Sequence, residues 1–247
     1  GMFVFDSEPI PADETGIVAT RQDLARSGRP WAYMTNAFVA RAGSNSKLRV
    51  FEPEGMGAAA FPSLASPPSG IAEHQVVQGR GLAGLEEAAP EGAPVRGSGL
   101  PLEYLILPES DLNGAGLLYF ARYVAIANYG VRRFLAEQLA RPVSSPLIEC
   151  LATERLSIYY FQNADAFDSV RVFVTAWLDS APEAAPELEA NGCRPVARFR
   201  FDVDLHRVSD GALMASCRLR KSLRVPEREK GLVYESERLL GQLRPRA

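Results

Sequence analysis

The sequence contains few of the residues that build disulfide frameworks or metal centres. Its 247 residues include only three cysteines and two histidines. Cys150, Cys193 and Cys217 form no CxxC pair, and an odd number cannot pair completely, so a disulfide framework is not predicted. His74 and His206 lie far apart in the sequence, and we expect neither a bound metal nor another cofactor. Without disulfides, a reducing cytoplasmic environment is the expected location.

Long apolar runs and an excess of one charge are also absent. No run approaches the ~18–20 apolar residues that a membrane-spanning helix needs. Lysine and arginine together number 27 against 30 acidic residues, and a net charge of −3 excludes a general polycation for nucleic acid. We therefore expect neither a membrane nor a nucleic acid as a partner. A hydrophobic content of 47% predicts an ordinary globular protein with a core.

A segment poor in large apolar side chains divides the chain. Residues 80–101 are rich in glycine, alanine and proline, which is typical of a connection between structured units. We predict an N-terminal unit over residues 1–95, including most of this connection, and a C-terminal unit over residues 96–247. The N-terminal unit is smaller than a typical independent domain.

The C-terminal unit has a clear order of predicted elements. A short strand at residues 101–107 precedes a helix over residues 117–139, in which apolar side chains recur every three or four positions. Strands are then predicted at 156–162, 169–178 and 196–208, and a hairpin turn at 209–211 leads into a returning strand. No further helix is predicted. One antiparallel sheet wrapped around the long helix is the economical way to bury that helix, so the fold class is α+β.

The N-terminal unit carries strands without an equally long helix. Strands are predicted at residues 31–41 and 47–51, with a turn at 42–46 between them. Residues 71–78 are a candidate third strand, and residues 20–27 are the only helical candidate.

The most informative stretch is residues 111–123, where a polar, glycine-containing turn runs directly into the long helix. Asp111 or Asn113 can cap that helix, because a side-chain oxygen accepts a free first-turn N–H. Gly114 and Gly116 let the backbone bend tightly and let a ligand approach closely. N–H groups near Gly116 and Leu117, at the positive end of the helix dipole, would then face a carbonyl or enolate oxygen. Capping alone, without any contact to a substrate, is the structural alternative.

This stretch resembles the signature of hot dog thioesterases related to 4-hydroxybenzoyl-CoA thioesterase. Asp111, Gly116, residues 117–119 and Tyr123 fit that signature, whereas Asn113 stands where those enzymes carry a catalytic carboxylate. Thioester hydrolysis needs an activated water or a carboxylate nucleophile, and an asparagine supplies neither. Decarboxylation of a malonyl-type thioester needs only donors at the enolate oxygen, and an asparagine amide can donate.

Two further segments extend the resemblance. Together with 111–123, residues 159–165 and 202–215 are similar to a family of double hot dog biosynthetic proteins that includes the acyltransferase/decarboxylase of the leinamycin polyketide pathway. The resemblance implies a double hot dog fold, here with a reduced N-terminal unit. It implies a methylmalonyl-CoA-type substrate, loss of CO2 and delivery of the acyl group to an acyl carrier protein, with CoA or phosphopantetheine as part of the substrate. It also implies a catalytic tyrosine in the first half of the chain, for which Tyr33 is the candidate.

Several candidate substrate-binding residues have a structural interpretation as well. Tyr119 and Tyr123 lie four residues apart on one helix face, where they can pack in the core or reach the substrate. Asn163 and Asp165 follow a strand of aromatic residues, so they can form a turn or approach the substrate.

Three functions remain open. The chain can be an acyl-thioester enzyme of polyketide-type biosynthesis, acting as a decarboxylase, an acyltransferase or both. It can instead be a thioesterase with a displaced catalytic acid, or a non-catalytic hot dog module that binds acyl carrier proteins. The expected partners are acyl-CoA and an acyl carrier protein, and pairing of sheets within one chain or in a homodimer is open. The candidate contacts for phosphate or carrier protein are Arg122, Arg132, Arg133 and Arg141.

Overall fold

The structure, a computed structural model, describes residues 39–50, 69–85, 102–139, 145–179, 193–226 and 228–243. The chain divides into residues 1–37 and residues 38–247, and every described residue belongs to the second unit. Tyr33 and the helical candidate at residues 20–27 lie outside the described residues.

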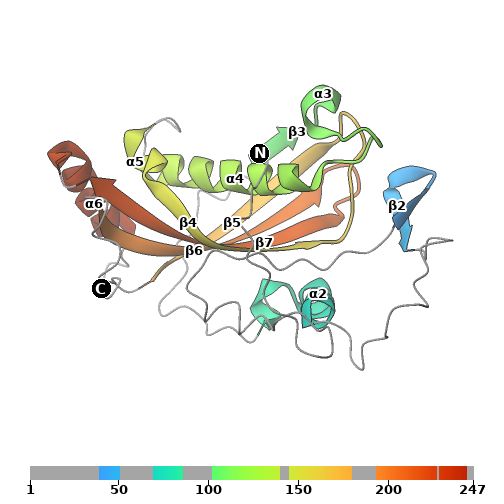
Figure 1. Cartoon of the computed structure of the whole chain (residues 1–247), viewed down its shortest axis with the longest axis horizontal. Coiled ribbons are helices and arrows are strands. Elements are labelled where there is room, and N and C mark those ends of the chain that lie inside the picture. Colours follow the sequence, from blue (N-terminus) through green and yellow to red (C-terminus); the bar gives the residue numbers. More distant parts are fainter. Residues whose placement is uncertain are drawn as a thin grey trace, which may run out of the picture. The chain divides into compact units, whose positions relative to one another are not determined.

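A five-stranded antiparallel sheet with a long helix across one face forms the centre of the described chain (Figure 1). The strands follow the order β3-β5-β6-β7-β4. Their bounds are β3 Leu102–Leu105, β4 Leu151–Tyr160, β5 Ser169–Asp179, β6 Cys193–Arg207 and β7 Leu213–Pro226. The helix, α4, spans Phe120–Leu139. This arrangement confirms the predicted α+β class and the predicted sheet around one long helix.

Apolar and polar residues alternate strictly along β6, so the strand has one apolar face and one polar face. Phe199, Phe201, Val203 and Leu205 are buried, while the residues between them form the other face of the sheet. The turn after β6 closes where Gly211 adopts a φ of +70°, a conformation that favours glycine, and donates its N–H to the Arg207 carbonyl. β7 then returns antiparallel, as predicted, and Phe201 faces Leu219 in the register.

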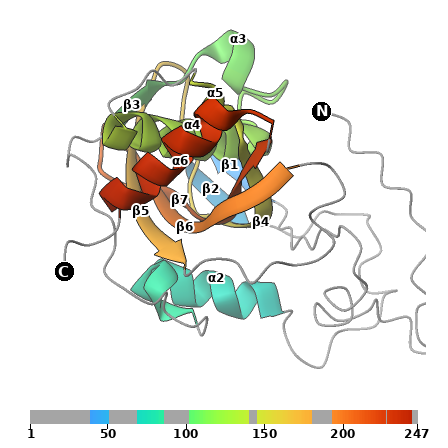
Figure 2. The same cartoon turned by 90° about the vertical axis from the view of Figure 1, so that its left-hand side faces the viewer.

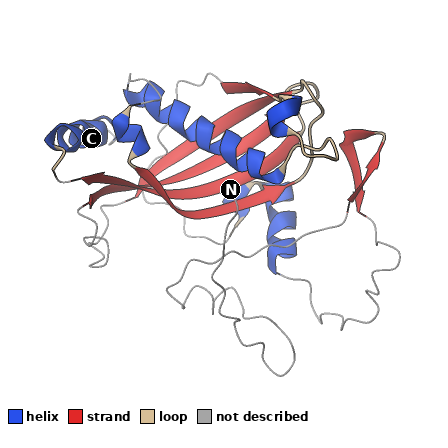
Figure 3. Ribbon diagram, turned by 45° about the horizontal axis from the view of Figure 1, so that its top comes forward, coloured by secondary structure: helices blue, strands red, loops and turns tan. Residues whose placement is uncertain are grey.

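Helix α4 lies across one face of this sheet (Figure 3). It packs against the apolar side of the sheet with a stripe of buried side chains. The stripe has the three- to four-residue spacing that the sequence predicted, and it contains Tyr123, Ile126, Ala127, Val131, Phe134 and Leu135. The rings of Phe134 and Phe201 meet edge to face, with centroids 6.4 Å apart. Tyr123 is therefore a core residue, which agrees with its structural interpretation.

The prediction of a strand at residues 71–78 is wrong, because this segment belongs to helix α2, Ser69–Arg80. Figure 2 shows α2 on the side of the sheet opposite α4. Val77 is buried there against Leu82 and Tyr159. Leu82 lies in a short 3₁₀ turn, η2 Leu82–Gly84, which follows directly. The adjacent valines of α2 favour a strand locally, but contacts with the sheet select the helix.

The expectation that no helix follows α4 is also wrong. A short helix α5, Pro146–Glu149, precedes β4, and helix α6, Lys230–Leu243, ends the described chain. Leu239 of α6 is buried in the core, with Leu232 and Val233 packed against it at helical spacing. The many charged residues of α6 hid this apolar stripe from the sequence pattern.

The described part of residues 1–95, the predicted N-terminal unit, begins with a small hairpin of β1, Val39–Ala42, and β2, Ser44–Val50. Its turn is shorter than the predicted 42–46, because Gly43 alone, at a φ of +98°, reverses the chain. The predicted reduced hot dog unit over residues 1–95 stays a prediction, since most of those residues lie outside the described ranges. Within those ranges, no helix has both the length and the apolar character needed to cross a membrane.

The close approach of α4 to β5 makes Gly130 a test of this packing. A Cβ atom built there would lie 2.6 Å from Cγ1 of the buried Val172. Alanine favours a helix over glycine by about 1 kcal/mol, but overpacking a core costs about 1–3 kcal/mol. We therefore expect Gly130→Ala to lower the free energy of unfolding in urea, and the double variant with Val172→Ala to recover part of the loss. The matched control is Gly231→Ala, where nothing lies within 4 Å, and it should not destabilise.

Candidate functional site

A buried carboxylate holds the chain just before the turn of residues 112–119, which we call the motif turn. Asp111 is the last residue of the short helix α3, Pro108–Asp111, and its side chain is inaccessible to solvent. It accepts the Leu107 N–H at 2.8 Å and the Tyr104 hydroxyl at 3.1 Å, and it forms an ion pair with Arg122 of α4 at 2.6 Å. Burial alone would raise the pKa of Asp111, but the Leu107 N–H, Arg122 and Tyr104 together lower it below its ordinary value. Asp111 is therefore an ionised structural anchor.

Asn113 builds the turn that follows. Its Oδ1 accepts the N–H groups of Ala115 and Leu117, each at 3.0 Å, and its carbonyl accepts the Gly116 N–H at 2.8 Å. The expectation that Asp111 or Asn113 caps α4 is wrong, because α4 begins only at Phe120. The N–H groups of Gly116 and Leu117, predicted to face a substrate oxygen, donate inside the turn instead. Gly116 has a φ of +70°, which explains the need for glycine, whereas Gly114 is exposed at the tip of the turn.

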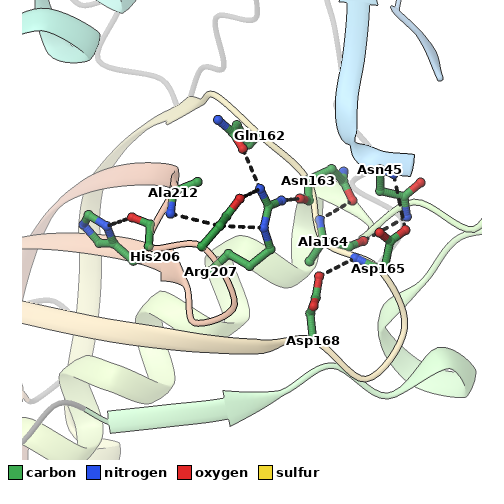
Figure 4. A network of polar contacts seen from close by, with 11 residues as sticks. Asn45, Gln162, Asn163, Ala164, Asp165, Asp168, His206, Arg207 and Ala212 are labelled. Carbon is green, nitrogen blue, oxygen red and sulfur yellow. Dashed lines mark hydrogen bonds and ion pairs between the residues drawn. The ribbon is translucent and has the colours of Figure 1, made fainter. Parts of the chain in front are cut away.

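Asn163 fastens the turn to the loop between β4 and β5. Its Oδ1 accepts the Leu118 N–H at 2.8 Å, and its Nδ2 donates to the Leu118 carbonyl at 3.3 Å. Arg207 donates to the Asn163 carbonyl and to Gln162 Oε1, and it is ion-paired with Asp210 at 2.6 Å (Figure 4). Asn163 is nearly inaccessible to solvent, so these contacts favour its structural interpretation.

Asp165 belongs to the same loop, between β4 and β5, and it also forms hydrogen bonds within the protein. Its carboxylate accepts the backbone N–H of Asn45, at 3.3 Å, from the β1–β2 hairpin. Its own N–H donates to Asp168 Oδ2 at 2.9 Å, as in a tight turn (Figure 4).

Two free backbone donors lie at the start of α4. The described hydrogen bonds give no acceptor to the N–H groups of Phe120 and Ala121, which carry the positive end of the helix dipole. Aromatic side chains surround this point: Tyr119 and Phe120 pack edge to face, and the Tyr160 hydroxyl donates to the Phe120 carbonyl at 3.3 Å. Tyr119, Phe120 and Tyr160 are 43%, 53% and 37% exposed, so Tyr119 is not a core residue. Free N–H groups at this end of a helix can donate to an oxygen that carries negative charge.

Sequence reasoning missed Tyr160, Asn45 and Arg207 as parts of this region. Tyr160 and Arg207 lie inside the motif segments that carried the resemblance, but they were interpreted there only as strand residues. Asn45 carried no local signal, because its partners are far away in the sequence.

The described residues offer no metal centre, since none of their histidine, cysteine and acidic side chains gather in groups of three or more.

Comparisons with known proteins concern the fold. No protein-family model matches the sequence, and no curated protein matches it. A 1,4-dihydroxy-2-naphthoyl-CoA thioesterase from Synechocystis is similar in structure, with a TM-score of 0.39 and 18% identity over 49% of this chain and 79% of that protein. Zebra fish thioesterase superfamily member 2 has a TM-score of 0.33 and 17% identity over 51% and 78%. A Staphylococcus aureus protein in complex with CoA has a TM-score of 0.33 and 14% identity over 49% and 75%. At these scores the likeness bears on neither substrate nor mechanism.

The ion pair of Asp111 predicts a pH-dependent stability. Asp111→Asn keeps the shape but removes the charge, so we expect the free energy of unfolding to fall by about 1–3 kcal/mol at pH 7. The folded pKa lies below the ordinary 3.8, so the charge stabilises fully above that value and less as the pH falls through the folded pKa. Urea unfolding from neutral to acidic pH measures the difference between wild type and variant.

The control for this experiment is Glu109→Gln, an exposed acid on the same short helix. Its difference from wild type should be small at every pH. A penalty for Asp111→Asn that stays constant into the acidic range would contradict the assignment of Asp111 as an ionised anchor.

Proposed function

We propose that this protein is an acyl-thioester enzyme whose reaction centre is the amino end of α4, and that it decarboxylates a malonyl-type thioester, transfers its acyl group, or does both. One observation carries the proposal: the N–H groups of Phe120 and Ala121 are free and lie beside exposed aromatic rings. The motif of residues 111–123 supports the same assignment, although the donors lie four residues later than the sequence suggested.

The proposed chemistry needs donors rather than a base. When the carboxylate of a malonyl-type thioester leaves as CO2, the electron pair of the broken C–C bond moves to the carbonyl and forms an enolate. The Phe120 and Ala121 N–H groups and the helix dipole would stabilise the negative charge on that oxygen. A proton from solvent at the α-carbon then completes the product.

The described side chains near the start of α4 support hydrolysis less well than decarboxylation. It needs a base or a carboxylate nucleophile near the thioester carbonyl. The carboxylates of the surrounding loops, Asp111, Asp165 and Asp168, all accept backbone N–H groups that hold those loops in place. A thioesterase would therefore need an acid from another part of the chain.

The arginines considered for phosphate or carrier-protein contact are mostly engaged within the protein. Arg122 pairs with Asp111, Arg132 with Glu149, and the Arg133 guanidinium lies 4.0 Å from Glu137. Arg141 lies outside the described residues. An acyl carrier protein remains a proposed partner, with its phosphopantetheine arm as part of the substrate.

The first experiment is incubation with malonyl-CoA and methylmalonyl-CoA, with and without a holo acyl carrier protein. CO2 release or a loaded carrier protein supports the proposal. Free diacid together with free CoA instead identifies a thioesterase, and binding without turnover identifies a non-catalytic module.

A pair of substitutions at Phe120 isolates the backbone donor. Phe120→Ala removes the ring and keeps the N–H, whereas Phe120→Pro removes both at the first helical position, where proline is tolerated. We expect the proline variant to have a kcat/KM about 100-fold below that of the alanine variant, the usual effect of losing one oxyanion donor. Equal rates for the two variants, with helix content unchanged by circular dichroism, would remove the Phe120 N–H from the mechanism.

Asn113→Asp tests the electrostatic preference for an amide. A carboxylate at this position can accept the same two N–H groups, so the turn should be preserved. Its charge would oppose the substrate carboxylate and the enolate. Two charges about 4 Å apart in water repel by about 1 kcal/mol, so decarboxylation should slow by up to about fivefold. Faster decarboxylation in Asn113→Asp would disprove this argument, and new hydrolysis would connect the position to the thioesterase signature.

A further inference from the structure

The β1–β2 hairpin has an unusual pattern of burial. Val39 at its start is 41% exposed, whereas Asn45 near its turn is only 2% exposed. A hairpin that docked through hydrophobic packing would bury its apolar side chains and expose its amide. The hairpin is therefore held in place by polar contacts at its tip.

Asn45 joins two loops that lie far from it in the sequence. Its Nδ2 donates to the Gly116 carbonyl at 2.6 Å and to the Ala164 carbonyl at 2.9 Å. Its backbone N–H donates to Asp165 (Figure 4). One loop belongs to the motif turn and the other carries Asn163, so Asn45 connects both sides of the proposed reaction centre.

The hairpin completes the hydrogen bonding of the motif turn. The carbonyls of residues 115–118 accept, in order, from Arg41, Asn45, the Asn113 N–H and Asn163. The N–H groups of residues 115–119 donate to Asn113, Asn163 or the Asp111 carbonyl. Backbone groups that are all engaged cannot rotate freely, so the position of the next residue, Phe120, is determined.

The Asn45 amide contacts the two loops through its nitrogen. Its Nδ2 serves two acceptors, whereas its Oδ1 is buried without a hydrogen-bond partner among the described residues. Both loops therefore share the one Nδ2 group, which constrains their placement relative to each other.

We infer that Asn45 is a positioning residue, and that the β1–β2 hairpin places the first free N–H groups of α4 for the reaction. The effect on rate rests on the proposed function. Asn45 does not touch the substrate, and it acts through the carbonyls of Gly116 and Ala164.

The kinetic test is Asn45→Leu, which keeps the size and removes both donors, compared with Lys47→Ala on the exposed part of the same hairpin. A misplacement of about 1 Å can cost about 100-fold in rate, so we expect kcat to fall about 10- to 100-fold and KM to change less than about twofold. In the Phe120→Pro background the same substitution should cause a smaller loss, because one of the two donors that it positions is already gone. Equal losses in both backgrounds, or a change confined to KM, would overturn the positioning role.

A second measurement is independent of turnover. Hydrogen exchange of the amides at residues 116–119 should accelerate at least about tenfold in Asn45→Leu, with no change in β6 and β7. If residues 116–119 keep their exchange rates, or if β6 and β7 accelerate equally, the inference fails. If the wild-type protein turns over no thioester, the proposed function is wrong. The hydrogen-exchange rates would still show whether the hairpin positions the turn.

Discussion

Two hydrogen bonds between the Asn163 side-chain amide and the backbone of Leu118 are the contact on which the candidate site depends. They pair the last part of the motif turn with the loop after β4, as neighbouring strands would be paired. Asn163 is itself held through its carbonyl by Arg207, whose charge is balanced by Asp210. Buried polar groups must be satisfied, so each of these contacts constrains the next.

The need to satisfy buried polar groups also determines which N–H groups remain free to bind a substrate oxygen. A helix has four N–H groups at its start without partners in the helix, and the preceding turn usually satisfies some of them. Here the N–H groups of residues 115–119 donate to Asn113, Asn163 and the Asp111 carbonyl. The turn leaves Phe120 and Ala121 unengaged at the positive end of α4, while Asp111 and Arg122 nearby neutralise each other. The amino end of the helix therefore keeps its attraction for a developing negative charge.

Local periodicity predicted most of the C-terminal fold. The alternation in β5, β6 and β7 and the spacing in α4 are properties of consecutive residues, so they are readable without tertiary contacts. The sequence pattern did not predict helices α2 and α6, because few of their residues are buried. Which side of each helix is buried depends on its contacts with the rest of the fold. For the same reason the predicted donors of Gly116 and Leu117 were misplaced, since the pattern showed a turn but not which groups would close it.

The sequence by itself determined that this chain would form an antiparallel sheet around one long helix, with a polar glycine turn at the start of that helix. Periodicity, turn chemistry and the Asp-x-Asn motif act over a few residues, so they needed no distant partner. Only the tertiary structure decided which N–H groups stay free and that Asn45 helps to hold them. Asn45 meets Gly116 and Ala164 from 71 and 119 residues away, and no local pattern records a hydrogen bond formed over that separation.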